Sequence, residues 1–264
     1  MKDKKEVKTI LQEGSLCEDK LEDIVVERPL QIVVNGEEFS MTMQTPGDER
    51  FLVRGLLHAE GIQFSDFIEY EQVDTCLGST VSVIISSKEE VRSDRALMSS
   101  SSCGLCGKKS LEDIFDDIEP LKDDIKISAS QIQSIYKKAS KNQTLFQSTG
   151  GCHAASVTDE HGNILCTFED IGRHNAVDKV VGWLLENNKI DEAKILLVSG
   201  RISYEIIQKC AKAGIPILTA ISAPSSLAID MAEYWGITIA AFCRADRATF
   251  YSQTQRMMDG TLSK

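Results

Sequence analysis

The fold is decided by residues 195–242, which read ILLVSGRISYEIIQKCAKAGIPILTAISAPSSLAIDMAEYWGITIAAF. Three short apolar runs alternate here with two amphipathic stretches, at 195–198, 203–213, 215–221, 225–235 and 237–242. Uninterrupted apolar strands are typical of a sheet buried on both faces, and strands alternating with helices connect in parallel. Gly214 and Gly236 stand where helix C-caps are expected. The segment therefore predicts a parallel α/β sheet covered by helices on both sides.

Upstream of this segment, the pattern adds a hairpin and two helices. Apolar runs at 154–157 and 164–168 flank the turn-forming residues 159–163. An apolar stripe over 176–185 predicts a helix after the hairpin, and residues 130–139 predict another before it. The expected order from residue 126 to residue 264 is thus a helix, a hairpin, and then alternating helices and strands.

The first hundred residues favour a small β-rich domain over 20–98. Strands are expected at 23–27, 30–34, 38–43 and 81–85, with the hairpin dipeptide Asn35-Gly36 between the second and third. Residues 45–49 open a helix that Gly61 ends. Residues 1 to about 20 are polar and are expected to be frayed, and residues 99–125 are expected to form a mobile loop and linker.

The composition excludes several classes of protein. A hydrophobic share of 42% and a charged share of 26% are ordinary for a globular chain. Forty acidic residues against 29 basic ones give a net charge of −11, which disfavours binding to nucleic acid or to an anionic membrane. Residues 1–20 carry no apolar signal region, and no run is long enough to span a membrane. We expect a soluble, cytoplasmic protein.

Basic side chains follow the predicted strand ends. Arg173 comes after the hairpin, Arg201 after the strand at 195–198, and Arg244 and Arg247 after the last strand. In parallel sheets, ligands bind beyond the carboxyl ends of the strands, near helix N-termini. The pattern favours a phosphate or nucleotide pocket. The alternative is that these arginines form surface ion pairs with nearby carboxylates, at Glu169, Asp170, Glu205 and Asp246.

The one C-x-x-C motif, Cys103 to Cys106, admits several chemistries. Zinc would need two more ligands, for which Cys152 and His153 are the obvious choice. A thioredoxin-type dithiol belongs on a strand-to-helix turn, which this segment lacks. A nucleophilic cysteine fits better, because the neighbouring lysines at 108 and 109 could lower its pKa. Such a thiolate can hold sulfur as a persulfide, which the second thiol then releases. Incidental cysteines in a Ser/Gly loop are the plain alternative.

Nucleobase deamination was the competing chemistry for this order of elements. Zinc deaminases carry H-x-E followed by P-C-x-x-C. This chain has no H-x-E, and Ser101-Ser102 precede its C-x-x-C. Deamination is therefore not expected.

Five motifs, taken together and in order, resemble the FdhD family, the accessory sulfurtransferases of formate dehydrogenase. They are SCGLCG at 102–107, GCHAA at 151–155, EDIGRHNAVDK at 169–179, SGRISYE at 199–205 and RADR at 244–247. The resemblance covers roughly residues 20–252. It implies a three-layer αβα domain similar to cytidine deaminases that has lost the zinc chemistry, beside a smaller N-terminal domain.

The resemblance also implies a function. A member of this family carries sulfur from a cysteine desulfurase to the bis-guanine-dinucleotide form of the molybdenum cofactor, which formate dehydrogenase then receives. Cys103 resembles the family's persulfide cysteine, with Cys106 its partner. Residues 242–247 resemble its cofactor-binding stretch, and a guanine nucleotide is expected to fit the same site. That stretch comprises Phe242, Cys243, Arg244, Ala245, Asp246 and Arg247.

Within that stretch, Arg244 and Arg247 are the stronger candidates for direct contacts, since Asp246 adds a negative charge beside a phosphate-bearing ligand. The role of His174 is open between a ligand contact and a core position. A cofactor-binding chaperone with a structural metal at the C-x-x-C remains the alternative function. We expect the chain to form a homodimer.

Overall fold

The computed structural model describes residues 3–86, 118–245 and 247–258. Cys103, Cys106 and Asp246 lie outside the described residues, as do residues 99–117 of the expected loop and linker. The strands of the described residues form a six-stranded sheet, a four-stranded sheet and a separate two-stranded ribbon.

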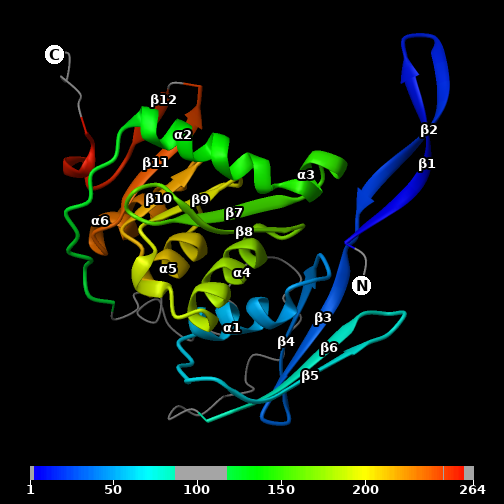
Figure 1. Cartoon of the computed structure of the whole chain (residues 1–264), viewed down its shortest axis with the longest axis horizontal. Helices are drawn as coiled ribbons and strands as arrows, with labels where there is room; N and C mark the ends of the chain where they lie inside the picture. The colour runs from blue at the N-terminus through cyan, green and yellow to red at the C-terminus, as the bar shows by residue number, and fades with distance from the viewer. Residues whose placement is uncertain (1–2, 87–117, 246, 259–264) are drawn as a thin grey trace.

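The six-stranded sheet contains the segment that decides the fold (Figure 1). Its strands are β7 (His153–Thr158), β8 (Ile164–Asp170), β9 (Ile195–Val198), β10 (Ile217–Ala220), β11 (Thr238–Arg244) and β12 (Arg247–Phe250). The order is β12-β11-β10-β9-β7-β8, and β9, β10 and β11 are parallel, as predicted. The sheet as a whole is mixed, because β7 runs antiparallel to both neighbours and an unpredicted strand, β12, folds back on β11.

Helices cover both faces of this sheet, which gives the expected three-layer αβα arrangement (Figure 1). The helices are α2 (Ala129–Ala139), α3 (Thr144–Thr149), α4 (Arg173–Glu186), α5 (Tyr204–Lys212) and α6 (Ser226–Tyr234), with short 3-10 turns η2 (Ser140–Asn142), η3 (Ile190–Glu192) and η4 (Thr254–Arg256).

Alternation along the strands places two apolar cores on opposite faces. Leu196 and Val198 of β9 belong to the core under α4, α5 and α6, whereas Ile195 and Leu197 pack with α2. Gly214 and Gly236 both have φ +68°, the left-handed conformation of a helix C-cap, as predicted. Among the described residues, every helix is too short or too polar to cross a lipid bilayer.

The four-stranded sheet lies in the first part of the chain, in the order β4-β3-β6-β5. Its strands are β3 (Arg28–Val34), β4 (Glu37–Gln44), β5 (Phe67–Asp74) and β6 (Ser79–Ile85). Helix α1 (Glu49–Ala59) covers one face, where its residues Leu52, Val53 and Leu57 complete an apolar core. Strand β5 was not predicted, because its sequence FIEYEQVD is mostly polar and it lies at the edge of the sheet.

The two sheets are joined through a close crossing of α1 and α4. A methyl group on Gly55 would overlap the backbone carbonyl of Asp178, and one on Gly182 would overlap the carbonyl of Phe51. Glycine at both positions lets the two helix backbones touch. This contact fixes the four-stranded sheet against the middle of α4.

The expectation that residues 1 to about 20 are frayed was wrong. They form most of a two-stranded antiparallel ribbon, β1 (Lys4–Glu13) and β2 (Leu16–Val25), which reaches away from both sheets (Figure 1). A two-residue turn joins the strands, and Gly14 supplies its left-handed φ of +62°. The domain limits 20–98, 99–125 and 126–264 remain a prediction.

Candidate functional site

The carboxyl ends of four strands meet at one edge of the six-stranded sheet. Because β8 and β9 are both antiparallel to β7, β8 points in the same direction as β9, β10 and β11. The segments that leave this edge carry the predicted basic residues Arg173, Arg201, Arg244 and Arg247. The structure thus brings the four arginines to the same edge, which we call the strand-end site.

Two helices begin at this site without a side-chain cap. The N-cap of α4 is Gly172, which has no side chain, and the N-cap of α5 is Ser203, whose hydroxyl accepts no hydrogen bond from the first turn. The N-cap of α6, by contrast, is Ser225, whose hydroxyl accepts from the backbone N–H of Ala228. Uncapped helix N-termini carry partial positive charge and free N–H donors, which suit a bound anion.

The carboxylates that could have neutralised the arginines are engaged elsewhere. Glu169 accepts hydrogen bonds from the backbone N–H groups of Leu145 and Phe146, at 2.9 and 2.7 Å. Asp170 forms an ion pair with Lys179, and Glu205 lies 2.7 Å from His174 Nε2. Asp246 lies outside the described residues. The alternative of local surface ion pairs therefore fails for these three carboxylates.

The arginines themselves are unpaired within the part of the chain that the structure describes. None of the ion pairs there involves Arg173, Arg201, Arg244 or Arg247. The side chain of Arg173 lies beside Gly200, and its Nε is buried with no hydrogen-bond partner. A buried donor without a partner is costly. The four unpaired arginines make the strand-end site positively charged, although the chain has a net charge of −11.

The β11–β12 hairpin concentrates this charge. Arg244 and Arg247 are direct cross-strand partners, an arrangement that repulsion between like charges destabilises. A β-bulge precedes them, and Phe242 and Ala245 have left-handed φ values of 53° and 52°. Strained backbone of this kind clusters at ligand-binding sites. Phe242 is 36% exposed on this hairpin.

Cys243 differs from its neighbours because its side chain is buried. Its Sγ donates to the backbone carbonyl of Ala240 at 3.4 Å, and burial raises the pKa of the thiol to about 11. The side chain packs in the core beneath α2. Within residues 242–247, the predicted cofactor-binding stretch, the Cys243 side chain thus anchors the hairpin to the core.

Two histidines lie at the same edge. His153 Nδ1 is 3.2 Å from Ser199 Oγ, which also accepts the backbone N–H of Ala154. Burial, and then the charges of Arg173 and His174, lower the pKa of His153 below its ordinary value. His174 Nε2 contacts Ser203 Oγ at 3.3 Å as well as Glu205. His174 therefore joins the start of α4 to the start of α5.

Cys152 and His153, the suggested zinc ligands, contact different groups. Cys152 Sγ lies 3.5 Å from Glu169 Oε1, and burial together with the Glu169 carboxylate raises the pKa of the thiol to about 12. His153 faces Ser199 instead. Within the described ranges, no three His, Cys, Asp or Glu side chains are grouped as metal ligands.

The sequence reasoning missed a buried clamp behind the site. Lys179 Nζ lies 2.9 Å from Asp170 Oδ2, and both side chains are almost fully buried. Lys179 also donates to the carbonyl of Thr45, whose N–H donates to Asp170 and whose hydroxyl accepts the N–H of Ile171. The loop after β4 is thus fixed to the start of α4. The sequence signal that could have indicated this clamp is Lys179 itself, a lysine among the apolar residues of α4.

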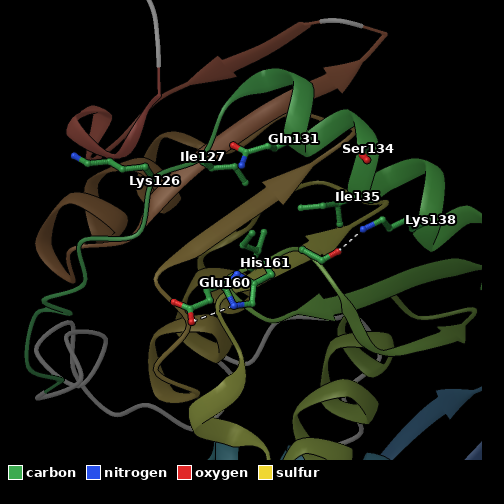
Figure 2. A pocket seen from close by; sticks show the side chains of 10 residues that line it. Lys126, Ile127, Gln131, Ser134, Ile135, Lys138, Glu160 and His161 are labelled. Carbon is green, nitrogen blue, oxygen red and sulfur yellow. Dashed lines mark hydrogen bonds and ion pairs between the residues drawn. The ribbon is translucent and has the colours of Figure 1, made fainter.

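A cavity at the other end of the sheet does not belong to this site. It lies between α2 and the turn joining β7 to β8, where Lys138 donates to the Gly162 carbonyl and His161 lies near Glu160 (Figure 2). Its volume of about 70 Å³ is far below that of typical ligand pockets. It has no room for a nucleotide.

Comparison with known proteins adds independent information. The model of the FdhD/NarQ family matches residues 25–258. Three proteins named sulfur carrier protein FdhD are similar over 89% of this chain. Those from Mycolicibacterium paratuberculosis and Mycobacterium tuberculosis are 39% and 38% identical to it, and the match covers 92% of each. The protein from Saccharolobus solfataricus is 39% identical, and the match covers 90% of it.

A solved structure shares the fold. It comes from Desulfotalea psychrophila, and its assigned name is formate dehydrogenase accessory protein. The two chains superpose with a TM-score of 0.78 over 97% of this chain and 100% of the other, at 24% identity.

Proposed function

Since the chain belongs to the FdhD/NarQ family, we propose that it is a sulfur carrier that serves the maturation of formate dehydrogenase. Cys103 accepts sulfur from a cysteine desulfurase and passes it to the bis-guanine-dinucleotide molybdenum cofactor, which binds as a substrate at the strand-end site. Formate dehydrogenase then receives the cofactor. The observation that carries the binding half of this proposal is the unpaired state of the four arginines among the described residues.

The residues at the strand-end site suit a phosphate-bearing ligand. Arg173 and Arg201 flank the uncapped starts of α4 and α5, so guanidinium and backbone N–H donors meet there. Arg244 and Arg247 would bind further phosphate oxygens, which would relieve their mutual repulsion. The part-exposed ring of Phe242 offers a surface on which a guanine base can stack. A free guanine nucleotide would occupy the same place.

Most of the described cysteines are poor candidates for the sulfur-bearing residue, which favours Cys103. Cys152, Cys166, Cys210 and Cys243 are buried, and burial raises the pKa of each thiol. A protonated thiol is a weak nucleophile. Cys17 and Cys76 are exposed, and they lie in the β1–β2 ribbon and in the turn between β5 and β6 rather than on the segments that follow the strands of the six-stranded sheet.

The sulfur transfer balances as two exchange steps. The Cys103 thiolate attacks the outer sulfur of the desulfurase persulfide, a new S–S bond forms on Cys103, and the desulfurase cysteine leaves as a thiolate. The Cys106 thiolate then attacks Cys103 Sγ, closing a disulfide and releasing hydrosulfide toward the bound cofactor. A dithiol reductant reopens the disulfide.

Intact-protein mass spectrometry tests the sulfur step. The chain is incubated with a cysteine desulfurase and cysteine, alongside Cys103→Ala and, as a matched control, Cys76→Ala. We expect a reducible gain of sulfur in the wild type and in Cys76→Ala, and none in Cys103→Ala. The absence of any gain in the wild type would refute the carrier function and leave a cofactor-binding chaperone, for which bound metal would be assayed. We also propose that the chain acts as a homodimer.

A further inference from the structure

The β1–β2 ribbon lacks the support that such ribbons need. Residues 10–21 are all exposed, and β1 and β2 form a sheet of two strands. Large apolar side chains are exposed along it, at Val7, Ile10, Leu11, Leu16, Leu21 and Ile24. A two-stranded hairpin is at best marginally stable in water, whereas three or more strands hold together. A further strand paired along one edge would therefore stabilise the ribbon.

The edge available for that strand is the outer edge of β1. Val26 N–H donates to Asp3 O, so in this ladder the odd-numbered residues of β1 are the ones bonded to β2. The even-numbered residues, among them Glu6, Lys8, Ile10 and Gln12, point their N–H and C=O groups away from β2. An unpaired row of this kind is a template for a further strand.

We propose that β1 pairs antiparallel with β1 of a second copy of this chain, around a two-fold axis at Thr9. In this register Lys5 lies opposite the partner's Glu13, Val7 opposite the partner's Leu11, and Thr9 opposite the partner's Thr9. Glu6 and Lys8 form backbone hydrogen bonds with the partner's Gln12 and Ile10. Two ribbons thus become one four-stranded sheet, β2-β1-β1-β2.

Charge complementarity selects a second copy as the occupant. Within the ribbon, Lys5 lies opposite Ile24 and Glu13 opposite Leu16, so neither has a charged cross-strand partner of its own. Lys4, which is also in β1, already forms an ion pair with Asp23 of its own ribbon at 2.6 Å. A two-fold contact matches Lys5 with Glu13 twice, as expected for a self-complementary interface.

Strand β2 matches itself less well. Pairing around Lys20 places Glu18 opposite Glu22 and the two Lys20 side chains opposite each other. Pairing around Leu21 matches Lys20 with Glu22 but places Asp19 opposite Asp23. Like charges directly opposite each other are destabilising. The self-complementary edge of the ribbon is therefore β1, and this assignment gives the proposed homodimer its contact surface.

A disulfide at the two-fold axis tests the register. Thr9→Cys is made in the full chain with Cys17 and Cys76 replaced by serine, since both are exposed. In the proposed register the two Thr9 positions form a non-hydrogen-bonded pair about 4.5 Å apart between Cα atoms, within the range of a disulfide. We expect covalent dimers on mild oxidation. Lys20→Cys, opposite Thr9 in the same ribbon, is the matched control and stays monomeric on a non-reducing gel.

A charge swap tests the complementarity. Glu13→Lys puts lysine opposite Lys5 twice, and we expect the dimer dissociation constant to rise at least about fivefold in sedimentation experiments. Lys5→Glu combined with Glu13→Lys restores association, while Glu18→Lys on β2 leaves it unchanged.

The outcomes separate this inference from the sulfur chemistry. A chain that is monomeric at all concentrations, or a dimer in which Thr9→Cys does not crosslink, would overturn the inference. Neither outcome bears on sulfur transfer, which mass spectrometry reads independently.

Discussion

Two charge-rich segments lie at the same edge of the six-stranded sheet, and their charges are used in opposite ways. At the junction of β8 and α4, most of the polar side chains are paired within the protein: Asp170 with Lys179 at 2.9 Å, His174 with Glu205 at 2.7 Å, and Asp178 with Lys209 at 2.6 Å. In the β11–β12 hairpin, Arg244 and Arg247 face each other without a carboxylate among the described residues.

The difference shows that a dense motif does not by itself mark a binding surface. The EDIGRHNAVDK segment is rich in chemically capable residues, yet most of them hold α3, α4, α5 and the loop after β4 together. Arg173 is the exception, because its Nε is buried and unpaired. Residues that are ion-paired within the protein hold the site in place, whereas the unpaired arginines remain able to bind a ligand.

The largest expected effect is the loss of an anchor. Lys179→Met leaves the buried Asp170 carboxylate without its ion-pair partner, which should lower the free energy of unfolding by about 3–5 kcal/mol. Urea unfolding measures this. The control Lys189→Met removes an exposed ion pair with Glu192 and should cost less than about 1 kcal/mol. Equal effects of the two changes would remove the distinction between anchoring and surface charges.

A smaller effect is expected where the anchor is steric rather than charged. Gly182→Ala would push a methyl group into the Phe51 carbonyl and force α1 from α4, at a cost of about 1–3 kcal/mol. Gly214→Ala meets no nearby atom but requires a left-handed backbone, and should cost roughly 1 kcal/mol. Thermal unfolding of both variants checks the order. A larger loss for Gly214→Ala would contradict the close helix crossing.

Arginines of the hairpin should behave in the opposite way. Arg244→Gln removes repulsion from Arg247 and should leave stability unchanged or raise it by about 0.2–1 kcal/mol. The same thermal unfolding assay reads this without ligand. A loss above about 1 kcal/mol would mean that Arg244 is an anchor like Lys179.

The smallest effect concerns His153. Its pKa is lowered in the folded chain, chiefly by burial, from the ordinary value of 6.5. The unfolded chain then binds a proton more readily than the folded one, so this contribution to stability is present at neutral pH and is lost as the pH falls below about 6.5. His153→Gln should lose less stability than the wild type between about pH 7.5 and about pH 5.5. Parallel losses in both proteins would contradict the shift.

Local pattern was enough for much of the fold. The parallel strands β9, β10 and β11 are continuous apolar runs, and Gly214 and Gly236 end helices as their positions predict. Strand β1 was missed because its alternation of charged and apolar residues, KKEVKTILQE, looks like a solvated tail when its partner strand is not considered. Strand β12 was missed because it has only four residues, RATF, and begins with a charged one.

The site was predicted only where position along the chain implies position in space. Strand ends place Arg173, Arg201, Arg244 and Arg247 at one edge, which topology alone predicts. The clamp of Lys179, Asp170 and Thr45 was not predictable in this way, because Thr45 lies in the loop after a strand of the other sheet and is more than a hundred residues away in sequence. Whether an arginine is free depends on such distant contacts.

The most direct test of the distinction is the binding of guanosine diphosphate to folded protein, measured by calorimetry. Arg244→Gln with Arg247→Gln should melt at or slightly above the temperature of the wild type. It should weaken binding by about tenfold or more, since each charge-assisted contact with phosphate contributes about 1.5–3 kcal/mol. Lys189→Met should bind like the wild type. Unchanged binding by the double arginine variant would contradict the claim that the unpaired charges of the strand-end site hold the ligand.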